Sequence, residues 1–222
     1  AAGLDVEVQR YAGAQQIMEA MLAGRCDASA NGTGSANIAI GELAAPGTFK
    51  IFCSNPSNAK NVLDQVLVPT ASAAKTIADL KGKRIAATRG TDPHIFLVRA
   101  LQQAGLTEKD VTLVLLQHAD GRTALARKDV DAWAGLDPLM AAAEIEDKAT
   151  IFFRKKEANT WGILNVREAF AKNHPALVRR VLATYEKARA WSLANPDQVK
   201  AYLVAATKLP EPVIARQLTE RT

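Results

Sequence analysis

The sequence predicts an α/β fold made of two similar lobes. Short apolar runs alternate with amphipathic stretches along most of the 222 residues, which is the pattern of helices packed on a sheet. Residues 15–31 also resemble residues 119–135 at one constant offset, and each copy follows a strand-like run, as in two repeated lobes. Two ordinary strand–helix–strand units with the same local solution would give a similar match.

The first third shows strands and helices bounded by glycine and proline. Residues 4–10 alternate apolar and polar side chains, which predicts a strand, and the amphipathic stretch 13–24 predicts a helix that Gly24 ends. The further elements expected here are a strand at 25–30, a helix at 36–43, a strand at 49–54 and a strand at 65–68. We expect the first crossing between the lobes to fall between Ser54 and Gln65.

The middle of the chain predicts a second alternation of strands and helices. The expected elements are a short helix at 72–80, a strand at 85–88, a helix at 94–104, a turn at 108–110 and a strand at 111–117. Asp120 is a good helix N-cap before the apolar residues 124–126, and residues 130–134 form a candidate strand. The turn at 135–138 then begins a helix that continues through Ala143.

The last third is expected to be mostly helical. A strand at 150–153 and a return crossing at 161–166 precede helices at 175–189, from Pro196 onward, and at 210–218. These expectations assign residues 1–63 and 162–222 to lobe I and residues 64–161 to lobe II.

Composition limits the function classes. The chain is 48% hydrophobic, enough for one large core or two modest ones, and has a formal net charge of +5. Its Lys and Arg residues are scattered among Asp and Glu, without the basic stripe and interleaved aromatic residues of nucleic-acid-binding proteins, so we expect no nucleic-acid partner. A mildly positive field suits a small anionic ligand.

The cysteines and histidines indicate no metal centre. Cys26 and Cys53 lie in or beside expected buried strands, which favours inert core thiols, while two positions alone leave a disulfide open. His94, His118 and His174 are too far apart for a local metal motif, and we expect neither a metal ion nor a cofactor. The sequence contains no apolar run long enough to span a bilayer and no signal peptide.

The sharpest physical signal is Gly90-Thr91 at a strand-to-helix junction. Thr91 can cap the helix, and the free N–H groups and the helix dipole would then hold an anion, although a plain helix cap explains these residues equally well. His94 is a candidate ligand contact near the start of the same helix, with a helix-end hydrogen bond as the alternative. Asp92 competes for the same positive helix end.

A glycine-rich loop follows the strand at 25–30. The run from Gly32 to Ser35 lacks the lysine of a P-loop and the spacing of a dinucleotide fingerprint. Its glycines would let backbone amides approach a small ligand, so Gly34 and Ser35 are candidate ligand contacts. A flexible loop is the competing interpretation.

Trp133 and Asp137 flank the end of the strand expected at 130–134. Trp133 is either a stacking wall for a ligand or core filling, and Asp137 is either a partner for a ligand ammonium group or a helix cap. Trp161 and Asn165 on the return crossing are further candidates for reaching the ligand. A serine–histidine–aspartate set, a metal cluster and a close carboxylate pair are all absent from the sequence pattern, which counts against an enzyme.

Several runs together carry a family resemblance. They are Leu80 to Ala86, Gly90-Thr91 with His94, Asp120 to Leu125, Val130 to Trp133, Asp137-Pro138, Ala169 to Pro175 and Ala194 to Pro196. They resemble the ABC-importer substrate-binding proteins for sulfonate, taurine and nitrate. The similarity covers nearly the whole chain in order and is specific for the family rather than for the ligand.

The resemblance implies a type II periplasmic-binding-protein fold, in which two α/β lobes joined by two crossing segments close over a small organic anion. It carries over, by position, ligand contacts at Gly34, Ser35, Gly90, Thr91, Trp133 and Asp137. Two departures concern the first lobe and the anion. Family members usually carry another strand and helix before Gly3, so lobe I is expected to lack them, and relatives tend to have a small neutral residue in place of Asp92.

The leading functional hypothesis is a non-catalytic, periplasmic or extracytoplasmic, monomeric binding protein. It would bind an alkanesulfonate-like or taurine-like anion reversibly in the cleft between the lobes and deliver it to an ABC permease in the membrane. One alternative is an enzyme like the pyrimidine-precursor synthase of the thiamine pathway, which shares the fold but would need a cysteine cluster and a cleft lysine. Another is the effector-binding domain of a LysR-type regulator, which would need a helix-turn-helix segment upstream.

Overall fold

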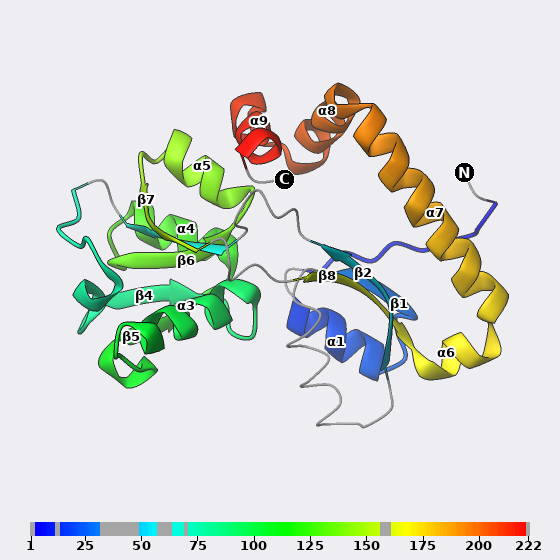
Figure 1. The fold of residues 1–222 in the computed structure, drawn as a ribbon, viewed down its shortest axis with the longest axis horizontal. Coiled ribbons are helices and arrows are strands. Elements are labelled where there is room, and N and C mark those ends of the chain that lie inside the picture. The colour runs from blue at the N-terminus through cyan, green and yellow to red at the C-terminus, as the bar shows by residue number, and fades with distance from the viewer. Residues whose placement is uncertain are drawn as a thin grey trace. The chain divides into compact units, whose positions relative to one another are not determined.

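The computed structural model describes residues 3–11, 14–31, 49–56, 64–68, 71–155 and 161–220 (Figure 1). The chain divides into two compact units. Unit 1 comprises residues 1–56 and 161–202, and unit 2 comprises residues 57–160 and 203–222. Each unit contains a sheet of its own.

Unit 1 is built on a three-stranded antiparallel sheet with the strand order β1-β8-β2. Its strands are β1 (Ala28–Asn31), β2 (Phe49–Pro56) and β8 (Trp161–Arg167), and its helices are α1 (Ala14–Leu22), α6 (Glu168–Asn173), α7 (Pro175–Ala194) and most of α8 (Pro196–Thr207). The central strand β8 comes from the second passage of the chain through this unit. Both passages are therefore needed to form the sheet.

Helix α1 forms where apolar residues recur at helical spacing, and it buries Met18 and Met21. Gly24 follows the helix at φ +72°, a left-handed conformation in which a Cβ would be strained. The Arg25 N–H then donates to the Ala20 carbonyl at 2.8 Å and closes the helix end. The glycine expected to end this helix therefore does so.

Unit 2 contains a five-stranded mixed sheet with the order β5-β4-β6-β3-β7. The strands are β3 (Asp64–Val68), β4 (Arg84–Ala87), β5 (Thr112–Leu115), β6 (Ala132–Leu136) and β7 (Thr150–Arg154). β4 runs parallel to both β5 and β6, whereas β3 runs antiparallel to β6 and β7. The parallel part of the sheet is thus the part that the strand–helix alternation predicts.

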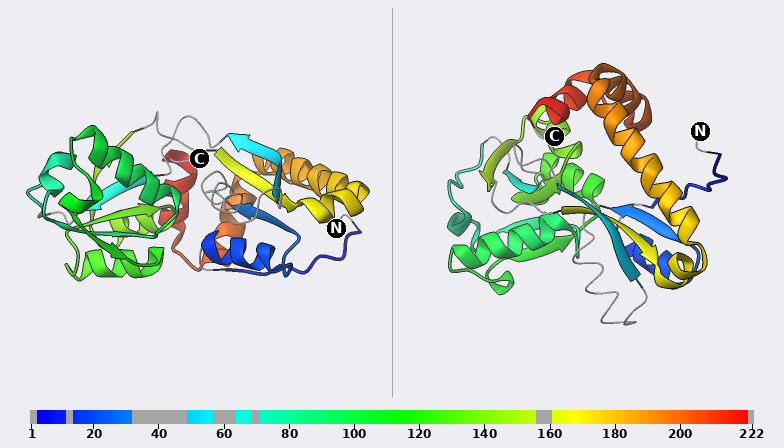
Figure 2. Two further views of the ribbon diagram at one scale, coloured as in Figure 1. Left: turned by 90° about the horizontal axis from the view of Figure 1, so that it is seen from below. Right: turned by 45° about the vertical axis from the view of Figure 1, so that its right-hand side comes forward.

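Helices cover both faces of the unit 2 sheet (Figures 1 and 2). The elements between and after its strands are η1 (Ile77–Leu80), α3 (Asp92–Gln103), η2 (Glu108–Asp110), α4 (His118–Ala126), α5 (Leu139–Ile145) and α9 (Glu211–Glu220). Ala132 and Ala134 pack in the core on the α3 side, and Trp133 packs in the core on the α4 and α5 side. The alternation of side chains along β6 therefore supplies both cores.

Helix α9 belongs to unit 2, although the sequence-based division assigns residues 162–222 to lobe I. Val213 of α9 packs with Ala141 and Ala142 of α5, and all three side chains are buried. Small alanine side chains let the two helices approach closely. This buried contact between α9 and α5 places α9 in unit 2. The lobe boundaries expected from the sequence stay a prediction.

Three local expectations are wrong. The helix expected at 72–80 is limited to the 3-10 helix η1 (Ile77–Leu80). Residues 4–10 carry no strand pairing, and the carbonyl of Gly3 instead accepts a hydrogen bond from Arg180 of α7 at 3.3 Å. Alternation alone does not make a strand, because a strand also needs a neighbour with free backbone groups. Helix α4 begins earlier than expected, with Gln117 as its N-cap, so Asp120 lies within its first turn.

Some expectations lie outside the described residues. They are the helix at 36–43, the glycine-rich loop at 32–35, most of the first crossing, and the Cys53 side chain. Cys26 is a free thiol, and its Sγ donates to the Ala28 carbonyl at 3.1 Å. In the part of the chain that the structure describes, no helix is long and apolar enough to cross a bilayer.

Candidate ligand-binding edge of unit 2

The carboxyl ends of β4, β5 and β6 meet at one edge of the unit 2 sheet, because β4 runs parallel to both neighbours. Helix α3 begins after β4, α4 after β5 and α5 after β6. The positive amino ends of these helices therefore lie along the same edge. Loops at this position of an α/β sheet form ligand sites in many proteins, which makes this edge the candidate site of unit 2.

The turn between β4 and α3 is held by its own hydrogen bonds. Gly90 adopts φ +72°, a conformation that favours glycine. Both the Thr91 N–H and the Thr91 hydroxyl donate to the Thr88 carbonyl, at 3.3 Å and 2.6 Å. Thr91 is the N-cap residue of α3 by backbone conformation, but its side chain does not cap the helix. Its buried oxygen keeps acceptor capacity, whereas its proton is engaged within the protein.

Thr88 joins two of the loops at this edge. Its hydroxyl donates to the Leu116 carbonyl at 2.7 Å, and the Leu116 N–H donates to the Ala87 carbonyl at 3.1 Å. These bonds extend the parallel pairing of β4 and β5 beyond the ends of both strands. The starts of α3 and α4 are thereby fixed relative to each other.

His94, the third residue of α3, reaches back to the turn. The Gly90 N–H donates to His94 Nδ1 at 3.3 Å, and His94 Nε2 lies 3.3 Å from a carboxylate oxygen of Glu108 in η2. Since Nδ1 accepts a hydrogen bond, the neutral ring carries its proton on Nε2, which donates to Glu108. Both ring nitrogens are thus engaged within unit 2. This is the helix-end hydrogen bond given above as the alternative to a ligand contact.

Asp92 and Asp137 lie at the starts of two helices and are nearly buried. Asp92 is the first residue of α3, where a carboxylate stabilises the positive helix end. A carboxylate oxygen of Asp137 accepts from the Ala141 N–H at 3.0 Å, so Asp137 acts as a helix cap for α5. These two acidic groups give the edge a mixed electrostatic character.

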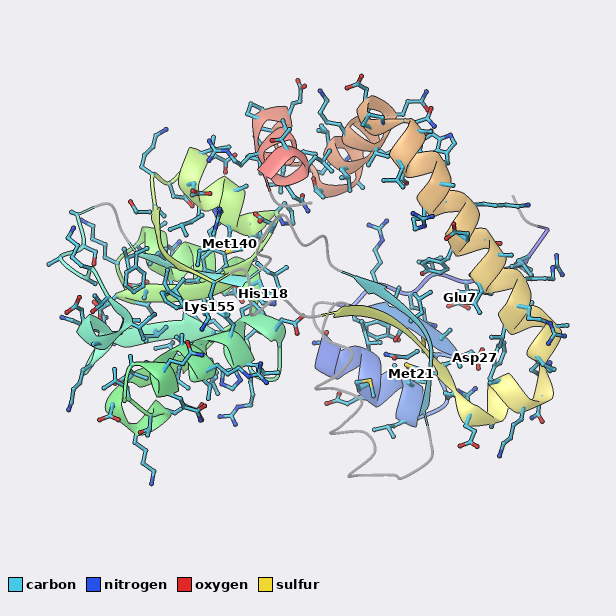
Figure 3. The ribbon with its side chains drawn as sticks, in the orientation of Figure 1. Glu7, Met21, Asp27, His118, Met140 and Lys155 are labelled. Atoms are coloured by element: carbon cyan, nitrogen blue, oxygen red, sulfur yellow. The ribbon has the colours of Figure 1, made fainter. Side chains whose placement is uncertain are left out.

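His118 is a residue at this edge that the sequence patterns did not single out (Figure 3). It is the first residue of α4, and its Nδ1 is buried with no hydrogen-bond partner. Burial lowers the pKa of the imidazole below its ordinary value of 6.5. The signal that could have found it is its position directly after the strand expected at 111–117. A lone histidine after a strand is too common a feature to be specific.

Trp133 is completely buried in the core beneath this edge. It packs with Ala86, Leu125 and Met140 on the α4 and α5 side of the sheet. A side chain without exposed surface cannot serve as a wall for a ligand in this conformation. The structure therefore supports the core-filling interpretation of Trp133.

The remaining sequence-based candidates lie elsewhere. Gly34 and Ser35 are outside the described residues, as is the side chain of Trp161. Asn165 is buried on the central strand of unit 1, where its amide nitrogen lies 3.5 Å from the Ser29 hydroxyl. The described residues contain no group of three or more His, Cys, Asp or Glu side chains that could hold a metal ion.

Solved structures of binding proteins share the fold of this chain. The alkanesulfonate-binding protein SsuA from Xanthomonas axonopodis pv. citri, bound to MOPS, is 28% identical with a TM-score of 0.85, and the match covers 96% of this chain and 72% of that one. The periplasmic aliphatic sulphonate binding protein SsuA from Escherichia coli is 30% identical with a TM-score of 0.80, covering 93% of this chain and 66% of that one. These similarities confirm the predicted type II periplasmic-binding-protein fold.

Sequence comparisons agree with the structural ones. The taurine-binding periplasmic protein of Escherichia coli is 31% identical over 131 residues, covering 55% of this chain and 40% of its own length. Another Escherichia coli relative, named for binding aliphatic sulfonates, is 32% identical over 207 residues, which cover 93% of this chain but 63% of the relative. The chain therefore spans less than two thirds of the curated relatives it matches. The family described as NMT1/THI5 like matches residues 1–199, and the chain belongs to that family.

Proposed function

We propose that this chain is the solute-binding component of an ABC importer and that it reversibly binds a small organic anion of the alkanesulfonate or taurine class. The observation that carries the proposal is the similarity, over more than nine tenths of the chain, to structures of proteins named for binding sulfonates. The partner would be an ABC permease, the location periplasmic, and the binding protein a monomer. Binding without catalysis fits the names of the two SsuA structures and of the taurine-binding relative.

The ligand contacts that we propose on unit 2 lie at the carboxyl edge of its sheet. Gly90 and Thr91 directly precede α3, His118 begins α4, and Asp137 precedes α5. The amino ends of α3 and α4 favour a negative sulfonate group, whereas Asp137 would favour the ammonium group of taurine. Gly34 and Ser35 remain proposed contacts of the first lobe, and Trp133 supports the edge from below.

The test is calorimetric titration together with thermal unfolding against taurine, ethanesulfonate, MOPS, nitrate, bicarbonate and a hydroxymethylpyrimidine. A ligand present at a hundredfold its dissociation constant stabilises a protein by about 2.7 kcal/mol. At one common concentration, the anion that binds most tightly should therefore raise the unfolding temperature most. We expect one or more sulfonates to bind and to be recovered unchanged.

Two results would contradict the proposal. The first is an absence of binding by every sulfonate while the pyrimidine binds, because that outcome favours an enzyme of pyrimidine synthesis. The second is chemical conversion of any bound compound. Gel filtration of the free and ligand-bound chain tests the monomeric state in the same samples.

A further inference from the structure

We propose that His94 is a positioning residue, which holds the Gly90-Thr91 turn in its ligand-competent shape by accepting the Gly90 N–H, and that it does so only while its ring is neutral. The inference rests on the proposed function for the statement that this turn contacts a ligand. The hydrogen bond itself belongs to the ligand-free chain, so it can be tested without any ligand.

The geometry explains why the turn needs such support. Gly90 is in the left-handed region at φ +72°, and a Cβ placed on it would meet nothing within 4 Å. The space on the Cβ side of this residue is therefore open. The bond from its N–H to His94 Nδ1 joins the turn to the first turn of α3, from the third helical position. A side chain at that position reaches back to the residues before the helix, as a glutamate or glutamine does in a capping box.

Protonation of the ring would break this bond. A neutral imidazole has one acceptor nitrogen, and here Nδ1 is that acceptor, since Nε2 is turned to the Glu108 carboxylate at 3.3 Å. In the imidazolium form both nitrogens carry protons, so Nδ1–H would face the Gly90 N–H and the two donors would repel each other. The turn would then lose the bond from the Gly90 N–H to α3, while the ring kept its contact with Glu108.

Glu108 of η2 is an ionic neighbour of the ring, with its carboxylate oxygen 3.3 Å from Nε2. Among the described elements packed around α3, η1 carries Asp79, whose carboxylate accepts the backbone N–H groups of Lys75 and Thr76. Asp92 lies on α3 itself, two residues before His94. The His94 side chain is 15% exposed, so solvent protons can reach it.

The experiment compares wild type with His94→Gln and His94→Ala by amide NMR of the ligand-free chain. In wild type, the Gly90 amide resonance should move together with the His94 ring signals as the ring is protonated, and its hydrogen-exchange protection factor should fall. Gln can still accept the Gly90 N–H and does not titrate, so His94→Gln should keep protection at every pH. His94→Ala should lose it at every pH. A Gly90 amide that ignores both pH and His94→Ala would overturn the proposal.

The ligand readout uses ethanesulfonate and MOPS as probes, with His174→Gln in unit 1 as the matched histidine control. Loss of one hydrogen bond corresponds to about a fivefold weaker affinity, so His94→Ala should bind about fivefold more weakly at neutral pH. His94→Gln should bind within about twofold of wild type and lose the pH dependence that wild type shows. Equal affinities for wild type and His94→Ala would overturn the positioning role. If wild type binds neither probe, the sulfonate assignment is overturned, but the NMR result for the Gly90 amide still tests the hydrogen bond.

Discussion

The indole of Trp133 lies directly on the Cα of Gly121, so that a Cβ built on Gly121 would lie 2.6 Å from Trp133 Nε1. Gly135, two residues further along β6 on the same face, meets the other side of the ring, and a Cβ there would lie 2.3 Å from an indole carbon. A large aromatic side chain on a short strand therefore requires glycine both in helix α4 and on its own strand. Three positions form one packing unit.

Gly121→Ala should destabilise the protein, against the ordinary effect of alanine in a helix. Alanine normally stabilises a helix interior relative to glycine, but here the methyl group would overpack the indole, which costs about 1–3 kcal/mol. Urea unfolding measures the change. In a Trp133→Phe background the contacted pyrrole atoms are gone, so the same substitution should cost less. If Gly121→Ala lowers the free energy of unfolding equally in both backgrounds, its contact with the indole is not the cause.

Trp133→Ala tests whether this side chain is core or ligand wall. Because the ring is fully buried, its removal should lower the free energy of unfolding by about 3–5 kcal/mol. Denaturant unfolding and sulfonate titration on the same sample separate the two roles. Weakened binding with unchanged stability would assign the indole to the ligand.

Arg122 should contribute more to stability than a typical surface arginine. Its guanidinium donates to Asp147 at 2.6 and 3.0 Å and to Glu146 at 2.5 Å, which ties α4 to the end of α5, and the pair with Asp147 raises its pKa. Arg122→Gln should cost about 1.5–3 kcal/mol, because hydrogen bonds to charged groups are the stronger ones.

Arg189→Gln is the matched control for the Arg122 substitution. Arg189 makes two hydrogen bonds to Glu186, at 2.9 and 2.7 Å, but both side chains are more than half exposed. Solvent screens an exposed pair, so its contribution to stability is small. The free energy of unfolding of both variants is measured by chemical unfolding at moderate salt. Equal decreases would contradict the larger contribution expected of Arg122.

His118 should make the protein less stable in acid. Burial lowers its pKa in the folded chain below the ordinary value of 6.5, so in the window below 6.5 the unfolded chain binds more protons and acidification favours unfolding. The penalty is absent well above pH 6.5 and grows as the pH falls towards the lowered folded value. The free energy of unfolding should therefore decrease less in His118→Asn than in wild type between about pH 7.5 and about pH 5.5. The exposed His174, replaced by Asn, should leave the loss unchanged.

The local patterns of this sequence predict most of its described strands and helices. Strands such as β4 and β6 and helices such as α3 and α7 follow from apolar spacing and from glycine and proline at their ends, which act over a few residues. The strand expected at 4–10 fails because pairing depends on a distant neighbour. The assignment of α9 to unit 2 depends on its contact with α5, which no local pattern contains.

The candidate ligand-binding edge is less predictable than the fold. Glycine before a helix start is a local signal, so the sequence predicts Gly90 and Thr91, but the direction of the Thr91 hydroxyl depends on the Thr88 carbonyl. The sequence leaves the role of Trp133 open because burial is a property of the whole core. No local pattern indicates His118, because its nitrogen is buried without a partner only when the neighbouring elements enclose it.

The pairing of Gln65 with Arg154 places the two ends of the stretch from β3 to β7 on adjacent strands. Such a stretch behaves as an insert that can be excised, because its new termini lie close together. Cutting there would strip α9 away and expose Ala141 and Ala142 to water. A minimal version of unit 2 for crystallography or NMR should therefore graft α9 back through a short peptide linker.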